Sequence, residues 1–471
     1  MIQRREFIKK SLTLAVGAAA GATLSGCGEP STELQTPISF TPGKPLPWVN
    51  WAGNHACIPK VRYAPRTEDE VASILKNSTG TVRPVGASHS FSAIVPTDDT
   101  FITTDLLKGL VSHNPETLEA ELMAGTRMHA VGEMLASVGQ AMPNMPDMNY
   151  PSMGGAIATS VHATGTEFGS TSSYVTGLTL ATPSGDLIDC DRQNNSEIFQ
   201  AARASIGALG VVTKMRIQNQ KPFELTEFGS MANTEEVLEN WDSLCEEYRH
   251  YEILPIPYSS LSLSVGTRLA KPGDKSSGED DPQAVHTLRS VFESVAWVPG
   301  IGQYAYDKIL NIVAKDAGGD TVRTGRSFDV FPHSRIVRFR EMEYTVPAEV
   351  GAQCLREVLA IIKKKKLPLF FPLEYRVVKG DDAWLSMFHQ RDGAAISVHQ
   401  YGDLDYKAPF AEIEPIFWKY GGRPHWGKIH TLDDKRLAEL YPHWSDFQEV
   451  RRELDPSGKM LNTHLKTLFG A

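Results

Sequence analysis

Arg83-Pro84-Val85-Gly86-Ala87-Ser88-His89-Ser90-Phe91 is the stretch that decides the fold of this chain. A strand-like run, Thr81–Val85, enters a loop that holds one glycine and several small residues. Without large side chains, the backbone N–H groups of such a loop can approach the oxygens of a pyrophosphate. The imidazole of His89 can then bond covalently to the ligand. Loops of this composition also occur by chance, so the meaning of this one depends on matching segments elsewhere.

Two later segments fit the same kind of ligand. Residues 151–166 read Pro-Ser-Met-Gly-Gly-Ala-Ile-Ala-Thr-Ser-Val-His-Ala-Thr-Gly-Thr, which suits backbone wrapped around an elongated polar molecule. Residues 422–428 read Gly-Arg-Pro-His-Trp-Gly-Lys. Together the three segments resemble the FAD-dependent oxidases of the vanillyl-alcohol oxidase superfamily, and within it the aldonolactone and alditol oxidase branch.

The resemblance implies an α+β fold with a PCMH-type FAD-binding domain and a cap domain over the substrate face of the flavin. It implies FAD attached covalently at His89; the alternative is a hydrogen-bonded loop histidine. In that branch His425 contacts the pyrimidine side of the flavin. The residues expected to hold FAD are Arg83, Pro84, Val85, Gly86, Ala87, Ser88, His89, Ser90, Gly155, Ala156, Val161, Thr164, Gly165, Thr166, Val212 and His425.

Alternating strands supply the candidate catalytic and substrate-binding groups. Glu374 and Arg376 are two residues apart in an apolar strand, so both side chains should point into one pocket, where they can bind adjacent hydroxyls. The same spacing predicts that His399 and Tyr401 line that pocket. Lys428 is the best cation for the reacting hydroxyl, and beside Arg376 its pKa should be lowered. The alternatives are a surface ion pair for Glu374 and Arg376 and a surface turn for the segment around Lys428.

Two departures from the branch concern the substrate and the electron acceptor. The usual His-Gly-(Thr/Ser)-Gly is His162-Ala163-Thr164-Gly165 here, which leaves FAD binding credible. Ala156 aligns with a substrate-contacting serine of alditol oxidases, so a simple polyol is less certain. Gly155 aligns with the position that gates oxygen, and a glycine there favours O2 as acceptor. The expected reaction is therefore oxidation of a CH–OH group of a sugar-like, polyol or aldonolactone substrate, with H2O2 as product.

Two other functions stay open. A dehydrogenase of the same fold would pass its electrons to a periplasmic or membrane carrier instead of O2. A lipid-anchored binding protein would use the fold without turnover, although the Glu374, Arg376 and Lys428 set argues against this. Net charge is −9, so a nucleic-acid partner is not expected. No zinc pattern or other metal site is predicted.

The first residues are typical of a Tat export signal. Arg4-Arg5 precede Phe-Ile-Lys-Lys and a weakly apolar run through Ala22. Leu24-Ser25-Gly26-Cys27 is similar to a lipoprotein box, with Cys27 as the lipidated residue; an ordinary signal peptide is the alternative. These features predict a lipid-anchored protein of the periplasm or cell envelope, whose only membrane contact is the anchor. The other cysteines are Cys57, Cys190, Cys245 and Cys354, for which buried free thiols are favoured over disulfides.

The rest of the chain divides into four parts. A Pro-rich linker (28–45) precedes the FAD-binding domain (46–220), the cap domain (221–415) and a C-terminal segment (416–471) that completes the flavin site. A helix should begin after the N-cap residue Thr67, and a hairpin should turn at 183–185. Residues 271–282 read as a surface loop, and 284–315 as mostly helical. The run Lys363–Lys366 fits the solvated end of a helix.

Overall fold

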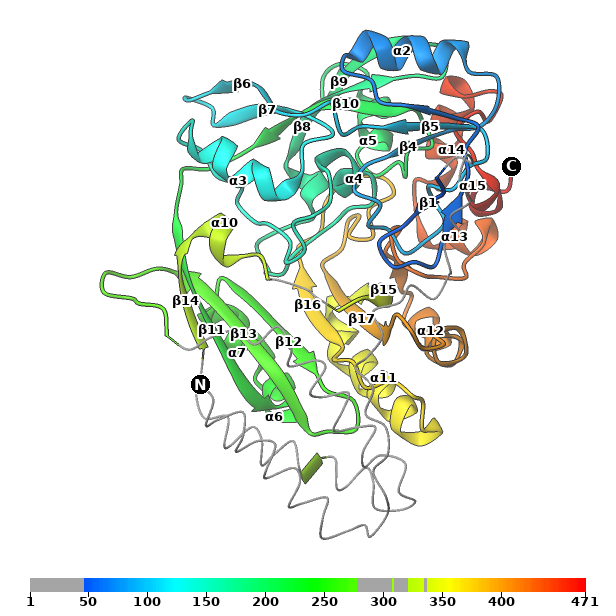
Figure 1. Ribbon diagram of the computed structural model, residues 1–471. Coiled ribbons are helices and arrows are strands. Elements are labelled where there is room, and N and C mark those ends of the chain that lie inside the picture. The colour runs from blue at the N-terminus through cyan, green and yellow to red at the C-terminus, as the bar shows by residue number, and fades with distance from the viewer. Residues whose placement is uncertain (1–45, 278–306, 309–320, 334–336) are drawn as a thin grey trace. The chain divides into compact units, whose positions relative to one another are not determined.

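The computed structural model describes residues 46–277, 307–308, 321–333 and 337–471 (Figure 1). Helices and strands are mixed throughout them, which confirms the predicted α+β class. The predicted export signal with Cys27, the linker, and most of the segments 278–282 and 284–315 lie outside the described residues. Among the helices that the structure describes, none has both the length and the apolar character of a membrane span.

Two sheets carry the first half of the described chain. The parallel three-stranded sheet has the order β3 (Val61–Tyr63), β5 (Thr100–Thr103), β4 (Val82–Val85). The antiparallel five-stranded sheet has the order β6 (Leu110–Asn114), β7 (Glu119–Met123), β10 (Val211–Gln218), β8 (Val175–Ala181), β9 (Leu187–Asp191). A short pair, β1 (Trp48–Val49) and β2 (Ala56–Cys57), precedes them. The helices of this part are α2 (Glu68–Asn77), α3 (Met128–Ala136), α4 (Met153–Ala158), η1 (Thr171–Tyr174) and α5 (Ser196–Ala202).

Local sequence explains where these elements begin and turn. The Thr67 side chain caps α2 by accepting a hydrogen bond from the Glu70 N–H, at 3.2 Å, as predicted. Val71 and Leu75, four residues apart, form its buried face. The hairpin of β8 and β9 turns at Gly185, whose φ of 91° is a left-handed conformation that favours glycine.

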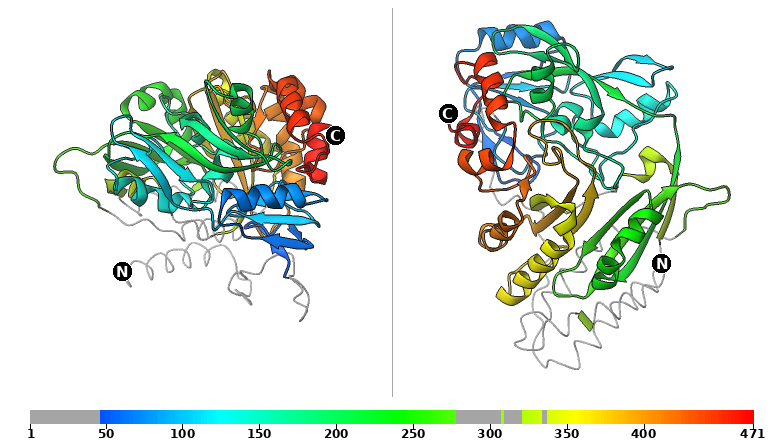
Figure 2. Two further views of the ribbon diagram at one scale, coloured as in Figure 1. Left: turned by 90° about the horizontal axis from the view of Figure 1, so that it is seen from above. Right: turned by 180° about the vertical axis from the view of Figure 1, so that it is seen from behind.

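One antiparallel sheet dominates the second half. Its order is β14 (Thr321–Arg326), β11 (Glu224–Asn233), β13 (Leu261–Leu269), β12 (His250–Pro255), β16 (Glu374–Val378), β17 (Gly393–Tyr401), β15 (Phe339–Pro347), β18 (Arg423–Pro424). The predicted boundary near residue 220 falls between β10 and β11, and β18 returns a late segment to this sheet. Its accompanying helices include α6 (Thr234–Glu239), α7 (Trp241–Glu247), α10 (Ser327–Val330), η2 (Ala348–Val350), α11 (Gly351–Lys365) and α12 (Lys407–Lys419). The helices α13 (Asp434–Leu440), α14 (Trp444–Leu454) and α15 (Thr463–Phe469) follow and lie together at the orange-to-red end of the chain (Figure 2). Helix α14 packs on α5.

The period of two along β15, β16 and β17 separates a core face from a polar face. Tyr344, Tyr375 and Ile396 are buried in the hydrophobic cluster that also holds Leu355 of α11. Most of the residues directly before and after each of these three positions are charged or polar. They project from the opposite face of the sheet. This alternation makes one sheet serve as core wall on one side and as the floor of a site on the other.

Arg83 ties three distant segments together. Its guanidinium is fully buried and donates hydrogen bonds to the carbonyls of Ile94, Ile206 and Gly207, each at 2.8 Å. A further hydrogen bond reaches the carbonyl of Met460, in the C-terminal segment. A buried carbonyl without a partner is costly, so this side chain fixes the first loop, the loop before β10 and the chain end relative to one another.

Candidate active site

One large cavity brings the three sequence segments together. It is bordered by the loop after β4, the start of α4, the loop before β10, the polar face of β15–β17 and the segment 425–428. It holds about 1580 Å³ of space, counting its open mouth. The cavity therefore joins the backbone of the loop after β4 and the charged side chains of β15–β17 in one space.

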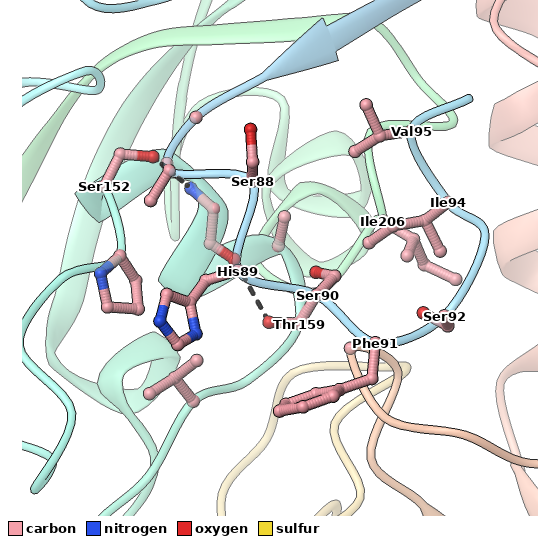
Figure 3. A pocket seen from close by; sticks show the side chains of 18 of the residues that line it. Ser88, His89, Ser90, Phe91, Ser92, Ile94, Val95, Ser152, Thr159 and Ile206 are labelled. Carbon is pink, nitrogen blue, oxygen red and sulfur yellow. Dashed lines mark hydrogen bonds between the residues drawn. The ribbon is translucent and has the colours of Figure 1, made fainter. Parts of the chain in front are cut away.

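The loop after β4 closes tightly against α4. A Cβ added to Gly86 would lie 2.0 Å from the Ser152 Oγ, so no larger residue fits there without movement. Ser152 caps α4 by accepting a hydrogen bond from the Gly155 N–H at 3.3 Å, and both residues line the cavity (Figure 3). Ser88 has a φ of 60°, which is strained for a residue with a side chain, and it directs the chain into His89.

His89 lies in this loop as a neutral imidazole. Burial, with the charge of Lys428 as a second cause, lowers its pKa to about 4. Its Nε2 atom is buried and has no hydrogen-bond partner among the described residues. An unpaired buried nitrogen is unusual in a folded protein, and here it belongs to a ring that lines a large cavity.

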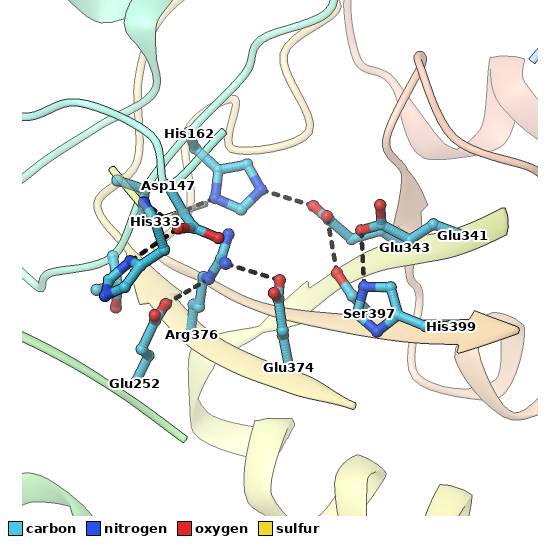
Figure 4. A network of polar contacts seen from close by, with 12 residues as sticks. Asp147, His162, Glu252, His333, Glu341, Glu343, Glu374, Arg376, Ser397 and His399 are labelled. Atoms are coloured by element: carbon cyan, nitrogen blue, oxygen red, sulfur yellow. Dashed lines mark hydrogen bonds and ion pairs between the residues drawn. The ribbon is translucent and has the colours of Figure 1, made fainter. Parts of the chain in front are cut away.

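Strand register sets the polar floor of the cavity. Glu374 pairs with Ser397 and Ser397 with Glu343, while Glu341 pairs with His399, so these five residues share one face across β16, β17 and β15. Figure 4 shows the resulting line of polar side chains, which continues to Arg376.

Arg376 is held by two carboxylates. Its Nε donates to Glu252 at 2.6 Å, and its NH2 lies 2.7 Å from an oxygen of Glu374. Burial would lower the pKa of Arg376, but the two carboxylates outweigh it and raise that pKa. Burial raises the pKa of Glu252, although Arg376 opposes the shift. The guanidinium is therefore a permanent, fixed cation at the cavity wall.

Lys428 has a carboxylate partner that the sequence did not indicate. Its ammonium forms an ion pair with Glu341, and it lies 4.9 Å from the centre of the Phe91 ring. Burial would raise the pKa of Glu341, but Lys428 and His399 lower it. His399 Nε2 is 3.5 Å from Glu341, while its Nδ1 is 2.8 Å from the carbonyl of Pro372.

A second buried group surrounds Glu343. His162 Nε2 lies 2.6 Å from one carboxylate oxygen, and the Ser397 hydroxyl donates to the other at 2.9 Å. Burial would raise the pKa of Glu343, but His162 and His425 lower it well below its usual range. His425 Nδ1 accepts a hydrogen bond from the Gly427 N–H at 3.0 Å, and burial lowers the pKa of His425 to about 3. His425 is thus neutral, and its Nε2 carries the proton.

Two triads in this network have metal-like spacing. The ligand atoms of His162, Glu343 and His425 lie within 4.8 Å of one another, as do those of a second triad: Glu341, Glu374 and His399. In both triads the carboxylates already bind an imidazole, a serine hydroxyl, Lys428 or Arg376. We therefore interpret them as parts of the polar floor.

Most of the predicted site residues line the cavity. These are Arg83, Pro84, Val85, Gly86, Ala87, Ser88, His89, Ser90, Gly155, Val161, Val212, Glu374, Arg376, His399, His425 and Lys428. The guanidinium of Arg83 is nevertheless used by backbone carbonyls, so its part in holding a ligand is indirect.

The remaining predicted positions are corrected. Tyr401 shares a strand face with His399 but lies beyond the end of the cavity, where the rings of Phe370 and Phe371 cover it at 5.0 Å. Ala156 follows Gly155 in α4, and the turn of about 100° per residue directs it into the core, where it is fully buried.

The end of the second segment also leaves the cavity. Thr164 donates through Oγ1 to the carbonyl of Tyr251 at 2.5 Å, and the Gly165 N–H donates to Val377 at 2.8 Å. Thr166 is exposed. Residues 164–166 therefore join two parts of the fold and do not line the ligand space.

Sequence reasoning missed Glu341 and Glu343. They stand two residues apart in Phe339-Arg-Glu-Met-Glu-Tyr-Thr-Val-Pro347, a strand that is buried along nearly its whole length. The two carboxylates alternate with Met342, Tyr344 and Val346, a pattern of a buried strand, and buried carboxylates are costly unless they are paired. That was the available signal. Glu252 gave a weaker signal in the sequence, because its role depends on the pairing of β12 with β16.

Comparison with known proteins gives consistent matches. Residues 59–191 match the FAD binding domain family and residues 215–468 match the D-arabinono-1,4-lactone oxidase family. L-gulono-1,4-lactone dehydrogenase of Mycobacterium tuberculosis is 31% identical over 430 residues, which are 90% of this chain and 99% of that protein. Alditol oxidase of Streptomyces sp. is 26% identical, covering 89% and 98%, and L-gulonolactone oxidase of Bos taurus 27%, covering 90% and 99%. Cholesterol oxidase of B. sterolicum has a similar fold, with a TM-score of 0.73 at 16% identity over 93% of this chain and 100% of that one.

Buried histidines predict how the stability of the fold depends on pH. Burial lowers the pKa of His89 to about 4 and those of His250, His425 and His430 to about 3. An unfolded chain, with histidine pKa values of about 6.5, binds more protons below that pH. The contribution of these groups to the free energy of unfolding is therefore fully present above about pH 6.5. It is lost progressively as the pH falls toward about 4. For His333, burial is outweighed by Asp147 and Glu227, which raise its pKa to about 10, so its contribution is lost as the pH rises toward 10.

Thermal unfolding between pH 4 and pH 7 checks the acid limb. We expect the Tm to fall below about pH 6.5, and His430→Leu to fall less steeply because one titrating group is removed. His113→Leu, at an exposed strand position, is the matched control and should follow the wild type. Equal slopes for wild type and His430→Leu would contradict the assignment.

Proposed function

Because the chain belongs to the D-arabinono-1,4-lactone oxidase family, we propose that it oxidises a CH–OH group of a sugar-like, polyol or aldonolactone substrate with FAD as cofactor. The observation that carries this proposal is the common cavity of the His89 loop and two cations, the buried Arg376 and the partly buried Lys428. Named relatives that share nearly their whole length with this chain act on lactones and alditols, which supports the substrate class.

The cavity suits FAD by its shape and its donors. The loop at Gly86 packs so closely on Ser152 that a Cβ would clash with its hydroxyl, and the small residues that follow line the cavity, which fits backbone closed around a pyrophosphate. His89 offers an unpaired buried nitrogen on the same side. Bound FAD supplies the hydride acceptor that the protein's own side chains lack.

The residues of the floor would bind and orient the substrate. Arg376 and Lys428 can donate hydrogen bonds to the oxygen of the reacting CH–OH group and stabilise negative charge there as the hydride leaves. Glu374 can accept a hydrogen bond from a neighbouring hydroxyl. Because Glu252 and Glu341 already hold the two cations, little movement is needed when substrate arrives.

We further propose that FAD is attached covalently through His89. The pKa of about 4 supports this, because a neutral imidazole keeps a nucleophilic nitrogen at physiological pH. A covalent bond would raise the potential of the flavin and prevent its loss outside the cell. The flavin that remains in the acid-precipitated, washed protein measures the covalent fraction.

We propose O2 as the electron acceptor, with a carrier-linked dehydrogenase as the alternative. Relatives of both kinds exist, since one is named a dehydrogenase and others are named oxidases. Gly155 lines the cavity, and a Cβ added there would contact only the Ser152 Oγ, at 3.2 Å. Apart from that hydroxyl, no described atom outside α4 and the residues next to Gly155 lies within 4 Å of the Cβ position, which supports access of O2. A non-catalytic binding protein would be colourless after purification with added FAD.

For location, we propose Tat export and lipidation at Cys27, supported by the twin arginines and the Leu24–Cys27 box. Metabolic labelling with a radioactive fatty acid should mark the wild type and not Cys27→Ser. Label in both proteins, or in neither, would contradict the proposal.

Loss of either cavity cation should stop chemistry without releasing FAD. We expect Arg376→Met and Lys428→Met to slow flavin reduction by about 100-fold or more, the scale for removal of one preorganised donor. Arg376→Lys, which retains the charge, should lose less and guards against misfolding as the cause. The measurement is the bleaching of flavin absorbance under anaerobic conditions with L-gulono-1,4-lactone, D-arabinono-1,4-lactone or an alditol.

Lys379→Met is the matched control. Lys379 follows the same strand but is exposed and pairs with Glu167, so its loss should leave reduction unchanged. Normal flavin reduction in both cavity variants would refute the assignment of the site. If none of these substrates reduced the flavin of the wild-type protein, the proposed substrate class would be wrong.

Filling the space at Gly155 should separate the two halves of the reaction. In Gly155→Ala the methyl group takes up room beside Ser152, so reoxidation by O2 should slow at least about tenfold. Reduction by substrate, and turnover with an artificial dye, should change little. Equal loss with O2 and with the dye would show that the variant disturbs the site in general.

A further inference from the structure

The segment Trp48–His55 surrounds the His89 loop without any function assigned so far. It precedes residues 59–191 and 215–468, the two ranges that match known families. Its side chains and backbone nevertheless make a dense set of contacts with Ser88, Ser90 and Phe91, the residues on both sides of His89.

Hydrogen bonds from this segment fix the backbone before His89. The Trp51 N–H donates to the carbonyl of Ser88 at 2.8 Å, and the Trp48 indole N–H donates to the Ser88 hydroxyl at 2.8 Å. Ser88 has the left-handed φ of 60° noted above. A strained residue persists only when its surroundings hold it. Here tryptophans hold both the carbonyl and the hydroxyl of Ser88.

The backbone after His89 is held by the same segment. Asn50 is almost fully buried and donates through Nδ2 to the carbonyl of Ser90 at 2.9 Å. The carbonyl of Phe91 accepts from Asn54 Nδ2 at 2.9 Å and lies 3.0 Å from His55 Nε2. The loop is therefore anchored on both sides of the histidine.

Aromatic stacking sets the plane of the imidazole. The Trp51 ring lies 4.7 Å from the His89 ring, at an interplanar angle of 21°. Trp51 is itself fixed by edge contacts with Phe339 at 5.2 Å and Phe91 at 6.0 Å. The ring of Tyr150 is parallel to the imidazole within 1°, at 6.1 Å. Stacking leaves the edge of the imidazole, where its nitrogens lie, directed along the plane that Trp51 defines.

We propose that Trp48–His55 positions His89 for its covalent bond to the flavin, with Trp51 as the positioning residue that sets the plane of the ring. This inference rests on the attachment proposed above. Bond formation in a fixed geometry is fast because little orientational freedom remains to be lost. Without Trp51 the cavity still binds FAD, but the imidazole samples orientations that do not react.

The attachment step balances with the acceptor already proposed. One bond forms between an imidazole nitrogen and the carbon of a methyl group on the flavin ring, while the imidazole N–H and one methyl C–H are lost. The two protons and two electrons released pass to O2 and give H2O2. Trp51 takes no part in this exchange, so its effect is on rate alone.

The test measures the rate of attachment in the full chain. Protein produced under riboflavin limitation is supplied with FAD in air, and the flavin that remains in the acid-precipitated, washed pellet is followed with time. We expect Trp51→Leu, which keeps apolar packing but has no flat ring, to slow attachment about tenfold or more. Trp51→Phe restores a ring and should stay close to the wild-type rate. Total bound FAD and the Tm should be similar in all three proteins.

Two controls separate the possible failures. Tyr63→Ala removes an exposed aromatic ring elsewhere and should attach FAD at the wild-type rate. His89→Ala should bind FAD with none in the pellet. No pellet flavin in wild-type protein would refute the attachment itself and with it this inference. Two other outcomes would overturn the positioning role alone, provided that FAD attaches to the wild type. One is an unchanged attachment rate in Trp51→Leu. The other is a loss of total bound FAD in that variant that accounts for its slower rate.

Discussion

The buried guanidinium of Arg83 is the interaction on which the cavity depends. One side chain satisfies carbonyls of Ile94, Ile206, Gly207 and Met460, which lie up to 377 residues away in sequence. Burial lowers its pKa to about 9, still above neutral pH, so the group remains charged and its hydrogen bonds are of the stronger, charge-assisted kind. Two of these segments, the loop after β4 and the loop before β10, border the ligand space, so their relative position is set before any ligand binds. A rigid frame of this sort suits a cofactor that must be held in one orientation.

The polar floor follows a similar logic with charges in place of carbonyls. Two cations, Arg376 and Lys428, are each paired with carboxylates, and Glu343 is paired with His162. An unpaired charge at these depths would cost several kcal/mol, so the pairs are a condition for burying the cations at all. The carboxylates of these pairs stand on nearby strands of one sheet, and this gives each cation a fixed place. The energetic requirement of burial and the geometric requirement of catalysis are thus met by the same pairs.

The sequence predicted what depends on local spacing. The Thr67 cap, the hairpin at Gly185 and the shared face of Glu374 and Arg376 follow from periodicity and turn chemistry, and the structure has all three. It could not predict where the cavity ends, so Tyr401 was placed in it, although Phe370 and Phe371 fill that space. Glu341 was missed because its partner Lys428 lies 87 residues away, and ion pairs between distant strands leave no local pattern. Ala156 shows the same limit inside one helix, where a rotation of one residue separates cavity from core.

In the reaction that we propose, substrate oxidation and flavin reoxidation would depend on different elements of this fold. The cations that would bind the substrate oxygen stand on β16 and in the segment after β18, whereas Gly155 stands on α4. A change on α4 can therefore alter access of O2 without moving either cation, since the ion pairs to Glu252 and Glu341 do not involve that helix. Proteins named as oxidases and a protein named as a dehydrogenase each share nearly their whole length with this chain, and a separation of this kind would allow both activities. The electron acceptor should accordingly be inferred from the residues of α4 and not from the substrate-binding floor.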